Sequence, residues 1–123
     1  MSASFEWERF DVRTSPVGSG RAPLEIPVEL QSDGASCAGA TRNISQEGAF
    51  VATYRPPSVG ERVTLRLAVP GLVVPLAVDA QVRWRRTIAD TAGRPPGIGV
   101  SFVNPSYDVS LCIAWLLHSH EAR

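Results

Sequence analysis

Three residues suited to hydrogen-bonding chemistry, Asn43, Ser45 and Gly48, stand at short fixed spacing just before an apolar segment. Asparagine can close an Asx-type turn, a serine hydroxyl donates and accepts hydrogen bonds, and glycine permits positive φ or a close approach of the backbone. The same set can therefore form a tight turn between two strands or one wall of a ligand site. Taken alone, the spacing favours the turn, because these are ordinary turn residues.

Arginine supplies all 12 basic side chains, since the chain contains no lysine. This bias can reflect selection for guanidinium groups, which make paired hydrogen bonds to carboxylates, phosphates and base edges. A GC-rich coding sequence explains the same bias, and we prefer that explanation. Arg83, Arg85 and Arg86 surround Trp84, which is an arrangement suited to single-stranded nucleic acid. Because the net charge is zero, we expect no nucleic acid polymer as partner. Trp84 is instead expected to pack in or cap the fold, with these arginines as a solvated strand edge.

The remaining reactive side chains predict neither a catalytic site nor a metal site. Cys37 lies among small residues and Cys112 in an apolar helical pattern, so we expect two free thiols. His118 and His120 end the predicted helix, where donor side chains favour the exposed carbonyls. No cluster of Ser, His and acid can be recognised, and Ser45 has no identifiable base partner. We therefore expect a protein that is not an enzyme and has no metal or cofactor.

Length and composition predict one compact domain, because 123 residues with 44% hydrophobic side chains suffice for a core. No apolar run approaches the ~20 residues of a membrane span, and Glu6 and Glu8 are atypical of a signal peptide. We expect a cytoplasmic protein without membrane insertion. Residues 1–20 are predicted to be a flexible extension, 21–118 the folded domain and 119–123 a tail.

The elements that must position these residues are mainly strands. Alternation of apolar and polar residues predicts strands from Leu24, over 63–69 and over 98–103, each with one buried face. A short strand is expected at 49–52, and one or two more within 72–84, whereas a loop from Asp33 to Ser36 leads to the turn at Asn43. Asn104-Pro105-Ser106 predicts the start of a helix whose apolar stripe continues to His118. Five or six short strands predict a small antiparallel β-barrel with the helix over one opening.

The order of these segments resembles the PilZ domain, a bacterial module known as a receptor for cyclic di-GMP. The resemblance extends from about Arg21 to Leu117. It rests on Asn43-Ile-Ser-x-x-Gly48 followed by Ala-Phe-Val, Pro57-Ser-Val-Gly-Glu-Arg-Val-Thr-Leu-Arg-Leu, Ala80-Gln-Val-Arg-Trp, Gly97-Ile-Gly-Val-Ser-Phe-Val-Asn-Pro-Ser and the terminal helix. It implies a six-stranded barrel in which Asn43 and Ser45 would bond a guanine edge and Gly48 would let the backbone approach the ligand.

The first of the two PilZ ligand motifs, Arg-x-x-x-Arg before the first strand, departs from the family pattern. Alignment by distance to that strand gives Arg21-Ala-Pro-Leu-Glu25, with a glutamate at the second arginine. A carboxylate cannot donate to guanine and repels phosphate, and one lost bidentate contact costs about 1–3 kcal/mol. The literal spacing occurs upstream as Arg9-Phe-Asp-Val-Arg13, where a solvated pair of arginines is the alternative interpretation.

Two functional hypotheses follow from the resemblance. The preferred one is a signalling module that acts through an unidentified protein partner in motility or type IV pilus-related regulation, with cyclic di-GMP binding weak or lost because of Glu25. The aromatic residues of the extension and Trp115 are candidates for that partner contact, although Trp115 can also be buried against the barrel. The alternative is a functional receptor whose regulatory ligand is cyclic di-GMP. Its candidate ligand-binding residues are Arg9, Arg13, Arg21, Asn43, Ser45 and Gly48.

Overall fold

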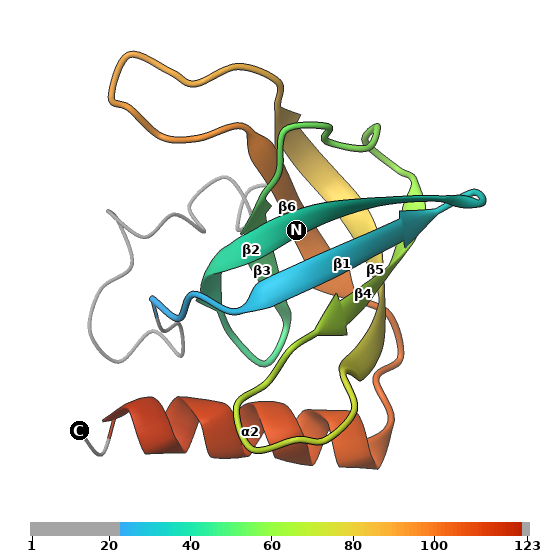
Figure 1. Ribbon diagram of the computed structural model, residues 1–123, viewed down its shortest axis with the longest axis vertical. Coiled ribbons are helices and arrows are strands. Elements are labelled where there is room, and N and C mark those ends of the chain that lie inside the picture. The colour runs from blue at the N-terminus through green and yellow to red at the C-terminus, as the bar shows by residue number, and fades with distance from the viewer. Residues whose placement is uncertain (1–22, 122–123) are drawn as a thin grey trace, which may run out of the picture.

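A closed barrel of six antiparallel strands forms the body of the protein in the computed structural model, which describes residues 23–121 (Figure 1). Around the barrel the strands follow the order β1-β2-β3-β6-β5-β4, and pairing of β1 with β4 closes it. The elements are β1 Pro27–Ser32, β2 Ala35–Ile44, β3 Gly48–Ala52, β4 Arg62–Leu67, β5 Leu76–Arg86, β6 Gly97–Phe102 and α2 Tyr107–Glu121. The predicted six-stranded barrel with a C-terminal helix is confirmed.

Alternate residues of each strand fill the barrel interior. In β4, Val63, Leu65 and Leu67 are buried, whereas Arg62 before them and Arg66 between Leu65 and Leu67 are exposed. β1 and most of β5 show the same alternation. Because successive side chains of a strand point to opposite faces, this pattern fixes which residues reach the core.

Strand β2 was not expected, because residues 35–42 contain no clear alternation of apolar and polar side chains. The chain turns at Asp33 and Gly34 alone, both at positive φ, and Ser32 then pairs with Ala35. These are the backbone conformations of a two-residue β-hairpin. The small residues that follow have low strand propensity, but they pair with β1 and, farther along, with β3. Tertiary pairing therefore overrides local propensity here.

Residues 72–75, in contrast, form a loop rather than the expected strand. Gly71 adopts a φ of 92°, and β5 begins only after Pro75. Both residues are poorly suited to a strand interior, because glycine loses conformational freedom there and proline cannot donate a backbone hydrogen bond. The first strand also begins at Pro27 rather than at Leu24. The apolar residues Leu72, Val73 and Val74 are consequently exposed.

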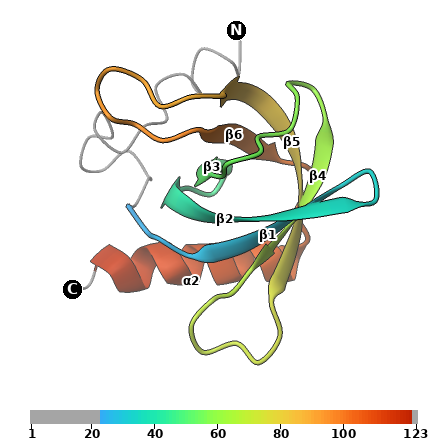
Figure 2. The same cartoon turned by 45° about the horizontal axis from the view of Figure 1, so that its top comes forward.

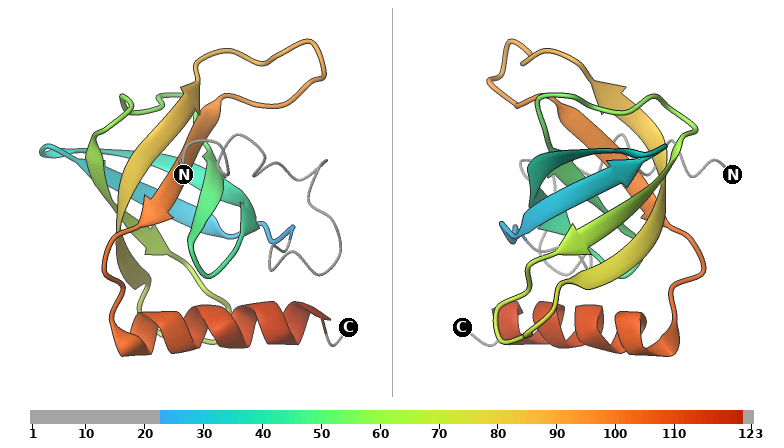
Figure 3. Two further views of the ribbon diagram at one scale, coloured as in Figure 1. Left: turned by 180° about the vertical axis from the view of Figure 1, so that it is seen from behind. Right: turned by 45° about the vertical axis from the view of Figure 1, so that its right-hand side comes forward.

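Helix α2 lies across one end of the barrel, opposite the loop that joins β5 to β6 (Figures 1, 2 and 3). Ser106 precedes the helix, and its hydroxyl accepts a hydrogen bond from the amide of Val109 at 3.2 Å, as an N-cap does. Ile113 and Leu116 are buried. The helix continues beyond His118 to Glu121. Within residues 23–121 it falls short of the length and apolarity that a membrane-spanning helix requires.

The buried hydroxyl of Thr41 connects β2 to the segment that precedes β1. It accepts a hydrogen bond from the amide of Ile26 at 2.8 Å and donates one to the carbonyl of Leu24 at 2.6 Å. The Thr41 amide also donates to the carbonyl of Ile26 at 2.9 Å. Three hydrogen bonds therefore hold the residues around Glu25 against the strand that carries Asn43.

Replacement of Thr41 by valine tests this connection, because valine keeps the shape and removes the hydroxyl. The variant leaves a buried amide and a buried carbonyl without their partner, which costs about 1–3 kcal/mol for each group left unsatisfied. We expect a lower free energy of unfolding in urea denaturation. Thr64→Val is the matched control, because within residues 23–121 the Thr64 hydroxyl donates a hydrogen bond only to the Asp79 carboxylate, at an exposed position. Equal effects of the two substitutions would contradict the structural role of Thr41.

Candidate functional site

The turn between β2 and β3 is closed by Ser45 and not by Asn43. The Ser45 amide donates to the Gly48 carbonyl at 2.8 Å. Its hydroxyl accepts from the amides of Glu47 and Gly48 at 3.2 and 3.3 Å. Gly48 is the first residue of β3 and pairs with Ser101, so it serves as an extended strand residue rather than as a left-handed turn residue. The expectation of a turn at this motif is confirmed, but its asparagine lies in strand β2.

A β-bulge in β2 sets the direction of the Asn43 side chain. Thr41 pairs with Val51 of β3, but Asn43 pairs with Phe50, so Arg42 is an extra residue in β2. In a regular strand Thr41 and Asn43 would point to the same face. The bulge instead places Asn43 on the face of Phe50, opposite to the face of Val51 and Thr41. Asn43 therefore lies on the outer face of the barrel, although nothing in its sequence motif indicates a bulge.

The side-chain amide of Asn43 is buried and has no hydrogen-bond partner among residues 23–121. The residue is 1% exposed, and neither its oxygen nor its nitrogen has a partner. Leaving a buried polar group unpaired costs free energy, and most buried polar groups in folded proteins are paired. An amide presents both a donor and an acceptor. Asn43 is thus a polar group on the outer face with unused capacity to bind.

Phe50, the strand partner of Asn43, packs against a second aromatic ring and a guanidinium. The rings of Phe50 and Trp84 stack with a centroid distance of 5.3 Å and an interplanar angle of 14°. The Arg86 guanidinium carbon lies 5.4 Å from the centre of the Phe50 ring and 5.2 Å from that of Trp84. These distances place the cation over both rings, where the ring quadrupole attracts it. The prediction that Arg86 belongs to a solvated edge is wrong, since its side chain is 16% exposed.

Trp84 reaches this face through a second β-bulge. Val82 of β5 pairs with Val100 of β6, whereas Trp84 pairs with Gly99, so Arg83 is the extra residue. Phe50 of β3 pairs with Gly99 from the other side. A Cβ atom on Gly99 would lie 2.8 Å from Cδ1 of Trp84, which means that the indole occupies the space a side chain would fill. The outer row therefore runs from Asn43 through Phe50 and Gly99 to Trp84.

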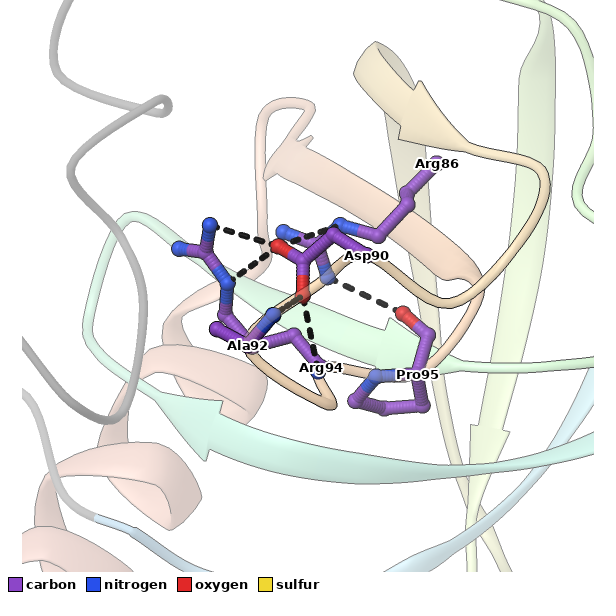
Figure 4. A network of polar contacts seen from close by, with 5 residues as sticks. All are labelled: Arg86, Asp90, Ala92, Arg94 and Pro95. Carbon is purple, nitrogen blue, oxygen red and sulfur yellow. Dashed lines mark hydrogen bonds and ion pairs between the residues drawn. The ribbon is translucent and has the colours of Figure 1, made fainter.

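The loop between β5 and β6 holds Arg86 in place (Figure 4). The Asp90 carboxylate accepts a hydrogen bond from Nε of Arg94 at 2.6 Å and lies 3.8 Å from Nε of Arg86. It also accepts from the amides of Ala92 and Arg94, each at 3.0 Å. Arg86 donates to the carbonyl of Pro95 at 2.9 Å. The Arg94 side chain, followed by the Arg94 amide, lowers the pKa of Asp90 from 3.8 to about 2.

Glu25, at the position aligned with the second motif arginine, is exposed and faces a cation. Its carboxylate lies 3.9 Å from Nε of Arg42, and the two side chains are 71% and 40% exposed, respectively. An ion pair this exposed contributes little to stability. It does, however, direct the Glu25 charge toward a positive partner on β2.

The structure brings together only part of the predicted ligand set. Asn43 near the end of β2, Ser45 in the turn and Gly48 at the start of β3 lie in the same β2–β3 hairpin. The three candidate arginines, Arg9, Arg13 and Arg21, lie outside the described residues. Sequence reasoning missed Phe50 as the strand neighbour of Asn43 and Arg86 as the cation over the Phe50 ring, because the register shifts of β2 and β5 leave no signal in the sequence.

Other candidate reactive groups take unremarkable positions. Cys37 and Cys112 are free thiols and partly buried, as expected. His118 and His120 lie in the last turn of α2. Among residues 23–121, His, Cys, Asp and Glu side chains nowhere gather in a group of three that could hold a metal ion.

Comparison with known proteins agrees with this architecture. The PilZ domain family model matches residues 9–117. The chain belongs to the PilZ domain family. The matched part begins at Arg9 and thus includes residues that their composition assigns to an extension. No curated protein matches the chain.

Solved structures with the same fold include three PilZ-type proteins. The Bacillus subtilis inhibitor of motility (MotI/DgrA) aligns with a TM-score of 0.69 at 16% identity, covering 83% of this chain and 49% of that one. The PilZ domain of YcgR from Escherichia coli, solved with c-di-GMP, aligns with a TM-score of 0.60 at 21% identity, covering 83% and 88%. The PilZ domain of CeSA from a cellulose-synthesizing bacterium gives 0.59 at 23%, covering 82% and 97%. This chain thus spans about half the length of the Bacillus protein, and identities this low show the shared fold.

Asp90→Asn tests whether the carboxylate charge holds the β5–β6 loop, because asparagine keeps an oxygen acceptor and removes the charge. A lowered pKa in the folded state means that the ionised carboxylate stabilises the fold above pH 3.8. That contribution is lost as the pH falls through 3.8 toward 2. We expect a lower Tm for the variant at pH 7 and a difference from wild type that shrinks over this acidic range in scanning calorimetry. A difference that does not change with pH would contradict a role for the charge.

Proposed function

We propose that this protein is a signalling module that binds cyclic di-GMP on the outer face of the barrel beside Asn43. The observation that carries the proposal is the buried amide of Asn43, whose donor and acceptor both lack a partner within residues 23–121. A guanine base presents both donors and acceptors on its edges. Membership of the PilZ family and the fold shared with the c-di-GMP-bound YcgR domain support this choice of ligand.

The surroundings of Asn43 suit a ligand that combines flat bases with phosphates. Ser45 holds the turn that positions Gly48, because its hydroxyl accepts hydrogen bonds from the amides of Glu47 and Gly48. Arg86 adds a fixed cation beside the Phe50 ring, which Asn43 adjoins through strand pairing. Guanidinium groups bind phosphate and base edges through planar, paired hydrogen bonds. The ligand's phosphates would therefore meet positive charge on this face.

We further propose that the working arginine motif is Arg9-x-x-x-Arg13. The family match begins at Arg9, so both arginines fall inside the matched part at the literal motif spacing. In this arrangement Glu25 does not replace a ligand arginine. Its carboxylate lies beside Arg42, whose positive charge partly offsets it. Arg21 remains a candidate contact from the aligned position.

A second candidate function is an adaptor with weak or absent cyclic di-GMP binding, and the observation that favours it is Glu25 at the aligned arginine position. In that case the protein acts through a protein partner in motility or type IV pilus-related regulation. The shared fold with the Bacillus subtilis inhibitor of motility is consistent with a motility role. A cytoplasmic location and the absence of enzymatic activity belong to both candidates.

Asn43→Ala tests the receptor proposal directly. Because the amide makes no hydrogen bond within the described residues, we expect Tm to be unchanged or raised. Loss of the ligand contact lowers affinity for cyclic di-GMP about ten- to hundredfold, the equivalent of about 1–3 kcal/mol. Isothermal titration calorimetry measures the affinity and a thermal melt measures Tm. A variant that melts earlier but binds as the wild type does would assign Asn43 a structural role instead.

Single substitutions before the first strand distinguish the two arginine motifs and the adaptor function. If the upstream motif binds, Arg9→Ala and Arg13→Ala each weaken cyclic di-GMP binding about tenfold or more, whereas Glu25→Gln leaves it unchanged. The same titration of Arg21→Ala reports on the aligned position. No binding by the wild type, together with binding gained in Glu25→Arg, would favour the adaptor and refute the receptor.

A further inference from the structure

Helix α2 carries an apolar stripe on the face that points away from the barrel. Tyr107, Leu111 and Trp115 follow one another at intervals of four and are 78%, 54% and 57% exposed. Ile113 and Leu116 on the other side are buried. Residues four apart lie on one face of a helix, so the three exposed side chains form a continuous stripe. A surface helix that serves only to close a barrel needs one apolar face, and α2 has two.

The polar residues on the same outer face are arranged so that the face complements itself. Asp108 lies in the first turn and His118 in the last turn, and both are exposed. When a second copy of α2 lies antiparallel, with the twofold axis at the height of Ile113, Leu111 faces Trp115 of the second copy. In the same register Asp108 faces His118 of the second copy. Each contact then occurs twice, as an isologous interface requires.

We propose that the protein forms a twofold-symmetric homodimer through the outer face of α2, in this antiparallel register. The charge arrangement selects this occupant over others. The helix contains no arginine that would attract a nucleic acid or an anionic membrane. The exposed Asp108 in the first turn and the exposed His118 in the last turn stand at opposite ends of the stripe, and an antiparallel copy brings each to the other.

The loop between β4 and β5 adds apolar surface at the same end of the molecule. Leu72, Val73 and Val74 in this loop are 46%, 101% and 70% exposed, and the loop lies at the end of the barrel that α2 covers (Figures 1 and 3). Exposed apolar side chains that gather at one end of a molecule are typical of a protein contact surface. One short helix pair buries less area than a standard interface, so we expect a reversible dimer whose contact the loop extends.

Sedimentation equilibrium of the full chain without nucleotide tests the dimer. Over about 5 to 200 µM we expect the weight-average mass to rise from the chain mass of 13.2 kDa toward twice that value. Trp115→Asp places a charge in the stripe and should keep the protein monomeric over the whole range. Ile88→Asp is the matched control, because Ile88 is 76% exposed in the β5–β6 loop at the opposite end of the barrel, and this variant should dimerise as the wild type does.

Cross-linking tests the register. In a Cys37→Ser, Cys112→Ser background, Leu111→Cys and Trp115→Cys chains are mixed and treated with a short bis-maleimide. We expect the mixed pair to cross-link faster than either chain alone, because residue 111 faces residue 115 of the second copy. The proposal would be overturned if the wild type stays monomeric, or if it forms a dimer that Trp115→Asp does not disrupt. In either case the apolar stripe binds a different partner or no partner. Equal rates for all pairs would overturn the antiparallel register. None of these outcomes depends on cyclic di-GMP binding.

Discussion

The outer face of the barrel depends on two breaks in strand register. In β2 and in β5 one extra residue, Arg42 or Arg83, shifts the pairing so that the next residue points outward. The β3–β6 pair between these strands has no such shift. Without the bulges, alternation would place Asn43 and Trp84 on the faces of Thr41 and Val82, inside the core. A polar amide and a large indole would then compete with the apolar packing that closes the barrel.

The residues around these bulges have complementary sizes. Gly99 lacks a side chain where the indole of Trp84 lies, and Phe50 stacks on that indole. Arg86 covers both rings and is itself fixed by Asp90 and by the Pro95 carbonyl. These packed and hydrogen-bonded side chains contrast with the Asn43 amide, which has no partner within the part of the chain that the structure describes. Folded proteins pair nearly all of their buried polar groups. When one buried polar group lacks a partner while its neighbours are well packed and hydrogen-bonded, the exception is typical of a functional site rather than of a loose fold.

Local patterns predicted the parts of this structure that obey simple periodicity. Val63, Leu65 and Leu67 alternate with polar residues, and β4 forms where that pattern lies. Strand β2 escaped prediction because its small residues carry no pattern, although Asp33-Gly34 is a hairpin signal. The Asn-Ser-Gly motif correctly marked the β2–β3 turn but assigned the turn contacts to Asn43, whereas Ser45 makes them. The bulges that align Asn43 with Trp84 arise from pairing between distant strands, which no local window of sequence contains.

The motif turn and helix α2 are joined by a short hydrogen-bonded path. The carbonyl of Glu47, inside the turn that Ser45 closes, accepts a hydrogen bond from the amide of Phe102 at 2.9 Å. From there the chain continues through the positive-φ residue Asn104 to the start of α2 at Tyr107. A ligand influences a distant surface only if it binds two arrangements of the protein with different affinities. The turn therefore contacts the last residue of β6, and the segment that follows that residue leads into α2. If the protein binds a ligand at the turn and associates through α2, as proposed above, this hydrogen bond lies on the shortest backbone path between the two sites.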